Sequence, residues 1–272
     1  MLSSVRYHIL IIIMIMLCVQ VDKAAARSKK YKDGQRNPVA LSMPVPDEPV
    51  LMAKREKDVP PIYEAADPNG LDLLMREGID VSHYQGMIDW KTVAQEGHLG
   101  YVYLKATEGA SLVDDTYEYN LREARKNGLK VGSYHFFRAQ VPQDEQLENM
   151  FSTIRAKDQD LLPIIDVEHM NRVSHGTFVE RLHRFMEAVT RHYGRRPILY
   201  TFVNFYNRYL QGEGFDKYPL MIAFYRDAQP ELNDGRQYVI WQYTAQGSMP
   251  GVDGDVDLSR LMDGFTINDI RF

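Results

Sequence analysis

From residue 75 onward, short apolar runs alternate with longer amphipathic stretches. The short runs are rich in β-branched and aromatic residues, which is typical of buried strands, and the longer ones have the apolar spacing of helices that bury one face. This pattern predicts strands over 78–82, 101–106, 130–137, 162–167, 197–201, 220–224, 238–244 and 252–258. Between them it predicts helices over 89–96, 116–127, 143–157, 175–192 and 204–210.

Residue types at the ends of these stretches support the helix boundaries. Gly128 and Gly194 follow predicted helices, where glycine is favoured because it readily adopts the left-handed conformation. Ser174 precedes the longest predicted helix, where a hydroxyl can cap free N–H groups. Repeated strand–helix alternation indicates parallel strands joined by crossover helices. Because little helix separates the last three strands, we predict a single-domain α/β fold, an irregular TIM-like barrel whose final third lacks helices.

The segment 1–26 has the features of a secretory signal peptide. Arg6 precedes an apolar run over 8–21, and three alanines follow at 24–26. The run is shorter than the about 20 apolar residues that span a bilayer, and an uncleaved membrane anchor is the alternative. The single cysteine, Cys18, lies in this segment, so a processed protein would contain no disulfide. We therefore expect an exported protein, in the periplasm or outside the cell.

The segment 27–75 shows no sustained helical or strand period. It contains basic residues clustered over 29–36 and six prolines between 38 and 61. This composition predicts a flexible linker that tethers a folded barrel domain over 76–272 to the membrane or the export site. A solvated linker is the simpler interpretation of the basic cluster, and contact with anionic lipid or wall polymer is the alternative.

Composition narrows the class of partner. With 272 residues, 44% of them hydrophobic and 25% charged, the chain has the make-up of an ordinary globular protein. Its formal net charge of −5 argues against nucleic acid, because phosphate backbones are bound by clustered lysine and arginine. We expect a monomer without a nucleic-acid partner.

The candidate chemistry centres on the run 162–168, in which apolar residues lead directly into Asp166 and Glu168. Alternate side chains of a strand share a face, so the two carboxylates point the same way with Cα atoms about 6.6 Å apart. Burying them together raises the pKa of one, which leaves one group able to donate a proton while the other stays charged. This pairing suits the cleavage of a glycosidic bond. Barrel enzymes place their active sites at such carboxyl ends of core strands.

Further acids lie in other predicted strands. Asp80 lies in the run 78–82, and Asp253, Asp255 and Asp257 alternate along the last strand. Three strands that each deliver an acid to the same end of a barrel would form one electronegative pocket. A solvated sheet edge explains any one of these acids but explains all three less well.

Aromatic side chains lie in or at the ends of the same strands. Sugar rings stack their C–H faces on aromatic planes and use tyrosine hydroxyls as hydrogen-bond partners. The chain has 17 Tyr and 11 Phe, so many aromatic residues belong simply to the core or the surface. The candidates for substrate binding are Tyr134, Phe136, Tyr200, Tyr225 and Trp241.

These residues fall in a series of short motifs whose order, from about residue 78 to the C-terminus, resembles glycoside hydrolase family 25, the lysozymes (muramidases) of bacteria, fungi and phages. The motifs are Gly78-Ile79-Asp80-Val81-Ser82, Gln85-Gly86, Asp89-Trp90, Lys105-Ala106-Thr107-Glu108-Gly109, Tyr134-His135-Phe136, Ile165-Asp166-Val167-Glu168, Pro197-Ile198-Leu199-Tyr200, Trp241-Gln242-Tyr243-Thr244 and Val256-Asp257-Leu258.

The resemblance implies a (β/α)5(β)3 barrel, with five β/α units followed by three antiparallel-leaning strands. It implies cleavage of the β-1,4 bond between N-acetylmuramic acid and N-acetylglucosamine in peptidoglycan, without metal or cofactor. Glu168 would be the general acid, and Asp166 would stabilise charge at the anomeric centre or the acetamido group of the substrate. Asp80 and Asp257 would hold and polarise this pair, and Gln242 would join the aromatic residues in binding substrate.

Three alternatives stay open. The first is a glycosidase of different specificity, such as a chitinase. The second is a metal-dependent hydrolase using Asp80, His83, His135, Asp166 and Glu168, although the chain lacks the tight His-x-His or His-x-x-x-His spacing of metal sites. The third is a non-catalytic peptidoglycan-binding protein. The expected carboxylate separation also fits both retaining and inverting hydrolysis.

Overall fold

The computed structural model describes residues 75–272. The predicted signal peptide or membrane anchor over 1–26, and the predicted linker over 27–75 except its last residue, lie outside the described residues. Within the described part of the chain, no helix combines the length and the apolar character needed to cross a bilayer.

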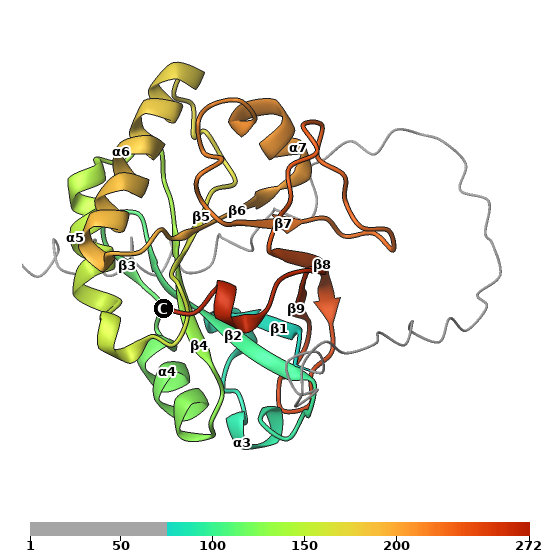
Figure 1. Ribbon diagram of the computed structural model, residues 1–272. Coiled ribbons are helices and arrows are strands. Elements are labelled where there is room, and N and C mark those ends of the chain that lie inside the picture. The colour runs from blue at the N-terminus through green and yellow to red at the C-terminus, as the bar shows by residue number, and fades with distance from the viewer. Residues whose placement is uncertain (1–74) are drawn as a thin grey trace, which may run out of the picture. The chain divides into compact units, whose positions relative to one another are not determined.

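Eight strands form a closed barrel, which confirms the predicted fold class (Figure 1). In chain order they are β1 (Glu77–Val81), β2 (Leu99–Glu108), β4 (Val131–Phe136), β5 (Ile164–Asp166), β6 (Ile198–Phe202), β7 (Leu220–Ala223), β8 (Ile240–Gly247) and β9 (Val256–Leu261). The barrel closes because β1 pairs with β2 on one side and with β9 on the other. A short strand, β3 (Leu112–Val113), pairs with the end of β2 as a hairpin.

Each of the first five barrel strands is followed by a helix. These are α3 (Trp90–Val93), α4 (Tyr117–Lys126), α5 (Gln143–Thr153), α6 (His175–Tyr193) and, after β6, α7 (Val203–Phe205) with the π-helical turn η4 (Tyr206–Leu210). Short 3-10 turns are η2 (His83–Gln85), η3 (Ala156–Asp158) and η5 (Ile267–Asp269). No helix separates β7, β8 and β9 in this described region, so the five β/α units and the helix-poor final third are as predicted.

The predicted helix ends are confirmed where side chains or glycines mark them. At the start of α6, the hydroxyl of Ser174 accepts a hydrogen bond from the N–H of Thr177, and Gly194 ends the helix with a φ of 69°. Gly128 follows α4 with a φ of 86°. Both glycines therefore adopt a positive φ, which glycine tolerates better than other residues.

The directions of the last three strands differ from the expectation. β7 is parallel to β6 and β8 is parallel to β7, so only β9 runs antiparallel to its neighbours. The expectation of three antiparallel-leaning strands is therefore wrong for the first two. The loop 224–239 explains the difference, because it is long enough to return the chain across the barrel without a helix. The shorter connection 248–255 makes β8 and β9 a hairpin.

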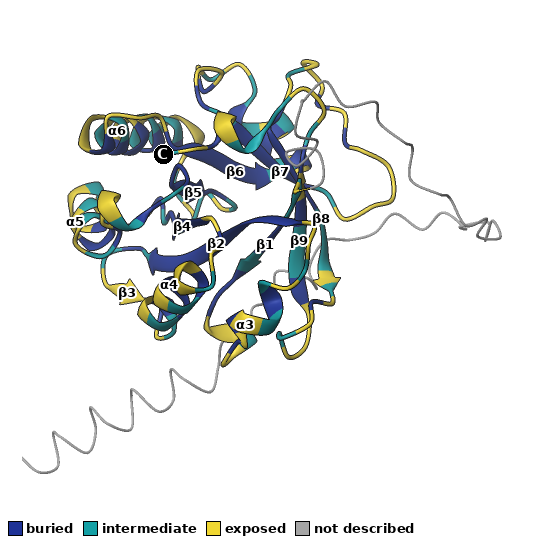
Figure 2. Cartoon of the chain, turned by 60° about the horizontal axis from the view of Figure 1, so that its bottom comes forward, coloured by how far each residue is buried: buried dark blue, intermediate teal, exposed yellow. Residues whose placement is uncertain are grey.

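Successive side chains of the barrel strands point alternately into two hydrophobic cores, one inside the barrel and one between the strands and the helices. One cluster, which includes Tyr101, Tyr103 and Ile164, fills the inside of the barrel. The larger cluster, which includes Leu104 and Phe185, contains the helix residues and packs between the strands and the helices. Figure 2 shows the helices turning their buried faces toward the barrel. The strands are thus buried on both faces and are mainly apolar, so polar side chains at their ends are candidates for a function.

Two glycines make room for tyrosine rings inside the barrel. An added Cβ at Gly78 would lie 2.0 Å from the ring of Tyr101, and one at Gly132 would lie 2.3 Å from the ring of Tyr103. Both tyrosines are fully buried, and their hydroxyls are held by hydrogen bonds to Ser259 and to the Leu162 carbonyl, respectively. A methyl group added at Gly78 or Gly132 would therefore clash with a buried tyrosine ring whose hydroxyl is already hydrogen-bonded.

Gly132→Ala should destabilise the fold by about 1–3 kcal/mol, as overpacking of a core typically does. Gly176→Ala is the matched control, because no atom lies within 4 Å of the added Cβ and α6 favours alanine over glycine. Urea unfolding of both variants measures the difference. Wild-type stability in Gly132→Ala would contradict this account of the barrel interior.

Candidate active site

The four carboxyl groups that were candidate catalytic residues meet at one end of the barrel. Asp166 is the last residue of β5, and Glu168 follows two residues later. Asp80 is next to last in β1 and pairs in register with Asp257, the second residue of β9. Because β9 runs against the parallel strands, it begins at the end where they finish. All four acids therefore lie at the mouth formed by the carboxyl ends of the parallel strands.

Burial distinguishes these acids from their neighbours in sequence. Asp166 is 7% exposed and the side chain of Glu168 is 9% exposed. β9 begins later than the predicted strand, so Asp253 and Asp255 lie in the exposed turn before it, whereas Asp257 is half-buried in the strand. The structure thus selects Asp257 from the three alternating acids.

Burial raises the pKa values of all four groups, and repulsion by a neighbouring acid adds to the effect at Asp80, Asp166 and Glu168. Burial raises the pKa of Asp166 well above its ordinary value, and the charge of Glu168 adds to the effect. Burial, and then Asp257, act in the same way on the pKa of Asp80. Burial, reinforced by Asp257, raises the pKa of Glu168 to about 7, and burial raises the pKa of Asp257 to about 6. Glu168 is therefore partly protonated at neutral pH, as a general acid must be.

The side-chain amide of Gln242, in β8, connects the acids to two tyrosines. Its Nε2 donates to Asp80 Oδ1 at 2.9 Å. Its Oε1 accepts from the hydroxyls of Tyr200 and Tyr225, both at 2.8 Å. Two O–H donors on one oxygen fix the orientation of the amide, so its N–H group faces the carboxylate. Gln242 is 1% exposed and therefore acts on Asp80 as a fixed donor.

Two carboxyl oxygens at the mouth are left without partners. Asp80 Oδ2 and Asp166 Oδ1 are buried and make no hydrogen bond to any described residue. Buried polar atoms in folded proteins are nearly always paired. Unpaired oxygens on two of the candidate acids indicate positions where a ligand can supply the partner.

Four of the five candidate aromatic residues lie at or below the mouth. Tyr134 and Tyr200 pack with the cluster inside the barrel. Phe136 ends β4 in register with Asp166 and is 8% exposed. Tyr225 follows β7 and is 44% exposed, so it offers the most accessible aromatic face of this group.

Trp241, the fifth candidate aromatic residue, packs with the outer cluster and not with the cluster inside the barrel. Side chains alternate along β8, and because Gln242 faces the inside, Trp241 faces outward. Its indole N–H donates to the carbonyl of Phe224 at 2.9 Å, and the guanidinium of Arg260 lies 6.0 Å from its ring. Trp241 therefore packs in the outer hydrophobic cluster and is 5% exposed.

The two histidines of the metal-site alternative lie apart from the acids. His135 is fully buried on the outer side of β4, where its ring stacks on Phe185 at 5.2 Å and its Nδ1 is 2.7 Å from Thr107 Oγ1. His83 Nδ1 is 2.7 Å from Asp114 Oδ2. Across residues 75–272, no three His, Cys, Asp or Glu side chains are grouped so as to hold a metal ion.

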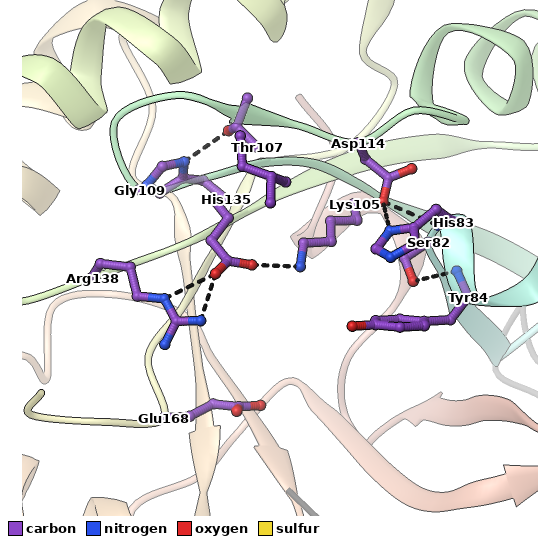
Figure 3. A network of polar contacts seen from close by, with 12 residues as sticks. Ser82, His83, Tyr84, Lys105, Thr107, Gly109, Asp114, His135, Arg138 and Glu168 are labelled. Atoms are coloured by element: carbon purple, nitrogen blue, oxygen red, sulfur yellow. Dashed lines mark hydrogen bonds and ion pairs between the residues drawn. The ribbon is translucent and has the colours of Figure 1, made fainter. Parts of the chain in front are cut away.

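A polar triad at the mouth, formed by Lys105, Glu108 and Arg138, has no role assigned from the sequence (Figure 3). Lys105 Nζ donates to Glu108 Oε2 at 2.7 Å, and Arg138 Nε donates to Glu108 Oε1 at 3.0 Å. Burial alone would raise the pKa of Glu108, but Lys105 and Arg138 hold this pKa below its ordinary value.

Strand alternation alone does not predict this triad. Residues three apart on a regular strand point to opposite faces. A register irregularity in β2 between Lys105 and Thr107 breaks the alternation, which lets Lys105 and Glu108 meet. Arg138 lies outside the recognised motifs, although it follows the Tyr134-His135-Phe136 motif closely.

Comparison with known proteins points to one family. The sequence model of glycosyl hydrolases family 25 matches residues 79–252. The YegX protein of Escherichia coli is 34% identical over 186 residues, which cover 67% of this chain and 68% of that protein. The autolytic lysozyme of Clostridium acetobutylicum is 34% identical over 191 residues, which cover 70% of this chain and 57% of that enzyme.

Solved structures give the same relationship. The bacterial lysozyme of Streptomyces coelicolor superposes with a TM-score of 0.65 at 27% identity, covering 72% of this chain and 94% of that one. A family 25 glycosyl hydrolase of Bacillus anthracis superposes with a TM-score of 0.64 at 29% identity, covering 71% of this chain and 91% of that one.

The raised pKa of Asp166 predicts an effect on stability. Folding raises this pKa, so the folded state binds the proton more tightly than the unfolded state does. The contribution to stability is complete below the unfolded value of about 3.9 and is lost as pH rises through the folded value. Asp166→Asn removes this loss and should be more stable than wild type at pH 7.5, within the about 0.5–2 kcal/mol typical of stabilising substitutions.

Thermal unfolding at pH 4.5 and 7.5 measures the effect, and the advantage of Asp166→Asn over wild type should grow with pH. Asp115→Asn, at an exposed carboxylate, is the control and should show no such trend. An Asp166→Asn variant less stable than wild type at pH 7.5 would show that the carboxylate is not under electrostatic strain.

Proposed function

The chain belongs to glycosyl hydrolases family 25, and on this premise we propose that it is a lysozyme that cleaves the β-1,4 bond between N-acetylmuramic acid and N-acetylglucosamine in peptidoglycan. One observation carries the proposal: four acids from three strands converge on one mouth, where Glu168 has a pKa of about 7. The names of two relatives, an autolytic lysozyme and a bacterial lysozyme, support peptidoglycan as the substrate.

In the proposed reaction, Glu168 donates its proton to the glycosidic oxygen. The bond between that oxygen and the anomeric carbon breaks, and the bonding pair stays with the oxygen. Positive charge that develops at the anomeric carbon favours the ionised form of Asp166, which Lys105 also favours. A water molecule then adds to the anomeric carbon and gives up a proton to a carboxylate of the mouth.

The remaining residues of the mouth position this pair. Asp80 receives a hydrogen bond from Gln242 and adds negative charge near Asp166. Asp257 lies opposite Asp80 and raises the pKa of Glu168, after burial, which keeps the acid protonated. Tyr225, exposed beside Gln242, offers a ring and a hydroxyl to the sugar.

Glu168→Gln should lower the release of new reducing ends from purified peptidoglycan by about 100-fold or more, because general acid catalysis is lost. Glu118→Gln, at an exposed site on α4, is the matched control and should retain wild-type rates. Wild-type turnover by Glu168→Gln would refute the assignment of Glu168 as the acid. No release of reducing ends by the wild-type protein itself would instead favour the binding-protein alternative.

Mass spectrometry of the released fragments identifies the bond. Products with N-acetylmuramic acid at the reducing end are expected from the proposed specificity. A parallel digestion of chitin discriminates the alternative substrate, since a chitinase would release chitin oligosaccharides and leave peptidoglycan intact.

We further propose that the chain acts outside the cytoplasm as a monomer, where its substrate lies, with residues 1–26 as a signal peptide and 27–75 as a tether. The charged start, apolar run and alanines of the first segment support export. Mass spectrometry of protein from the periplasm or medium should find an N-terminus near residue 27. An intact N-terminus at the membrane would indicate the anchor instead, and protein confined to the cytoplasm would contradict export.

A further inference from the structure

The polar triad lies beside the proposed acid. Figure 3 shows Glu168 below Arg138 and Lys105, and both cations act electrostatically on its carboxyl group. Lys105 is 7% exposed, and the side chain of Arg138 is 27% exposed. Two cations and one anion thus act on Asp166 and Glu168, and the reaction as described leaves Arg138 without a role.

The backbone around Arg138 is held with unusual completeness for a loop. Gln146, fully buried on α5, accepts from the N–H of Arg138 at 2.8 Å and donates to its carbonyl at 3.0 Å. The next residue, Ala139, donates its N–H to Asn171 Oδ1 at 3.3 Å and accepts from Arg181 Nη1 at 2.7 Å. Side chains from α5, from the loop after Glu168 and from α6 therefore fix two consecutive peptide units.

The loop that carries Glu168 contributes its own constraint. Asn171 and Arg172 both adopt a positive φ, at 51° and 65°. Such backbone is uncommon outside glycine and persists where surrounding contacts impose it. The contact between Asn171 and Ala139 joins the loop that carries Glu168 to the loop that carries Arg138.

The guanidinium of Arg138 is fixed as well. Its Nε and Nη2 both contact Glu108 Oε1, and it lies over the ring of Phe136 at 4.4 Å from the centroid. Lys105 Nζ lies 5.5 Å from the centroid of the same ring and binds the other oxygen of Glu108. Glu108 therefore holds both cations in place and limits the positive charge that they present to the mouth.

We propose that Arg138 is a positioning residue for Glu168. The guanidinium of Arg138 is held by Glu108, and its positive charge offsets the negative charges around Glu168 while Glu168 works as an acid. The inference rests on the proposed function and deepens it. It assigns opposite effects to the two partners of one ion pair, since Arg138 favours the ionised form of Glu168 and Glu108 opposes it.

The charged groups that face Glu168 give the sign of each effect. Burial and Asp257 raise its pKa, Arg138 and Lys105 lower it, and Glu108 raises it. Asp166 lies two residues away and is itself affected by Glu168, and His169 Nε2 lies 3.8 Å from Glu168 Oε2 on the exposed side. Loss of the charge at Arg138 should therefore raise the pKa of Glu168, and loss of the charge at Glu108 should lower it.

The test compares Arg138→Met, Arg138→Lys and Glu108→Gln by the pH dependence of kcat/KM on soluble peptidoglycan fragments at fixed ionic strength. Arg138→Met should move the basic limb up by about one pH unit, and Glu108→Gln should move it down. Arg138→Lys should restore the wild-type limb, because it keeps the charge, while kcat stays reduced because lysine cannot form the same clamp.

A matched control separates these effects from general loss of an arginine. Arg122→Met removes an arginine that also pairs with a glutamate, Glu123, and lies 5.7 Å from the centroid of the Tyr119 ring, but on α4. It should leave the pH profile unchanged. Limbs that stay in place, or that move in the same direction for Arg138→Met and Glu108→Gln, would overturn the proposal and leave a structural role for Arg138.

A second measurement is independent of activity. Each variant is compared with the same variant carrying Glu168→Gln, and the difference in unfolding free energy is followed against pH, which reports the pKa of Glu168 by linkage. If Glu168→Gln alone keeps wild-type activity, the proposed function fails. If Glu168→Gln is inactive but the linked pKa values do not move with Arg138 and Glu108, only this inference fails.

Discussion

The repulsion among four carboxyl groups gathered at the barrel mouth is the constraint on which the rest of the site depends. Closing the barrel creates it, because β9 lies between β8 and β1 and sets Asp257 directly opposite Asp80. Burial then makes each negative charge costly and each proton harder to remove. The two hydrophobic cores stabilise the fold and hold these groups together. The repulsion at the mouth lowers the stability of the fold, as is common at active sites. A glutamate, Glu168, with a pKa near neutrality is the direct result of that arrangement.

Different elements moderate the repulsion on two sides of the mouth. On the side of β8, the fixed amide of Gln242 donates to Asp80 and is oriented by two tyrosine hydroxyls. On the side of β2 and β4, the polar triad brings positive charge near Asp166 and Glu168. The neutral amide of Gln242 acts on Asp80, which does not take part in the proposed proton transfer. The charged side chains of the polar triad act on Asp166 and Glu168, which do. The carboxyl groups of one mouth therefore have different electrostatic surroundings, which is the condition for separate roles in the proposed reaction.

The sequence predicts most of this site because strand ends and acids coincide. Asp166 and Glu168 follow an apolar run, Asp80 lies in another, and the parallel order of strands brings such residues to one edge. The features that sequence cannot supply are those set by local irregularity. The displaced register in β2 brings Lys105 to Glu108 against the alternation rule. The outward direction of Trp241 depends on which residues of β8 face the barrel. Large apolar or aromatic side chains occupy both alternating sets of positions over 238–243, so the sequence does not reveal this direction.

The antiparallel β9 also explains why only one of three alternating acids belongs to the mouth. A parallel strand would reach the mouth at its end, but β9 enters the barrel there, directly from the turn 248–255. Asp253 and Asp255 share the alternation of Asp257, yet they precede the first paired residue, Val256, and remain in solvent. Because side chains change face at every residue, a shift of β9 by one position would turn Asp257 to the outer side. The pairing of β9 with both β1 and β8 fixes its register, so the same hydrogen bonds that close the barrel also place the acid that helps to keep Glu168 protonated.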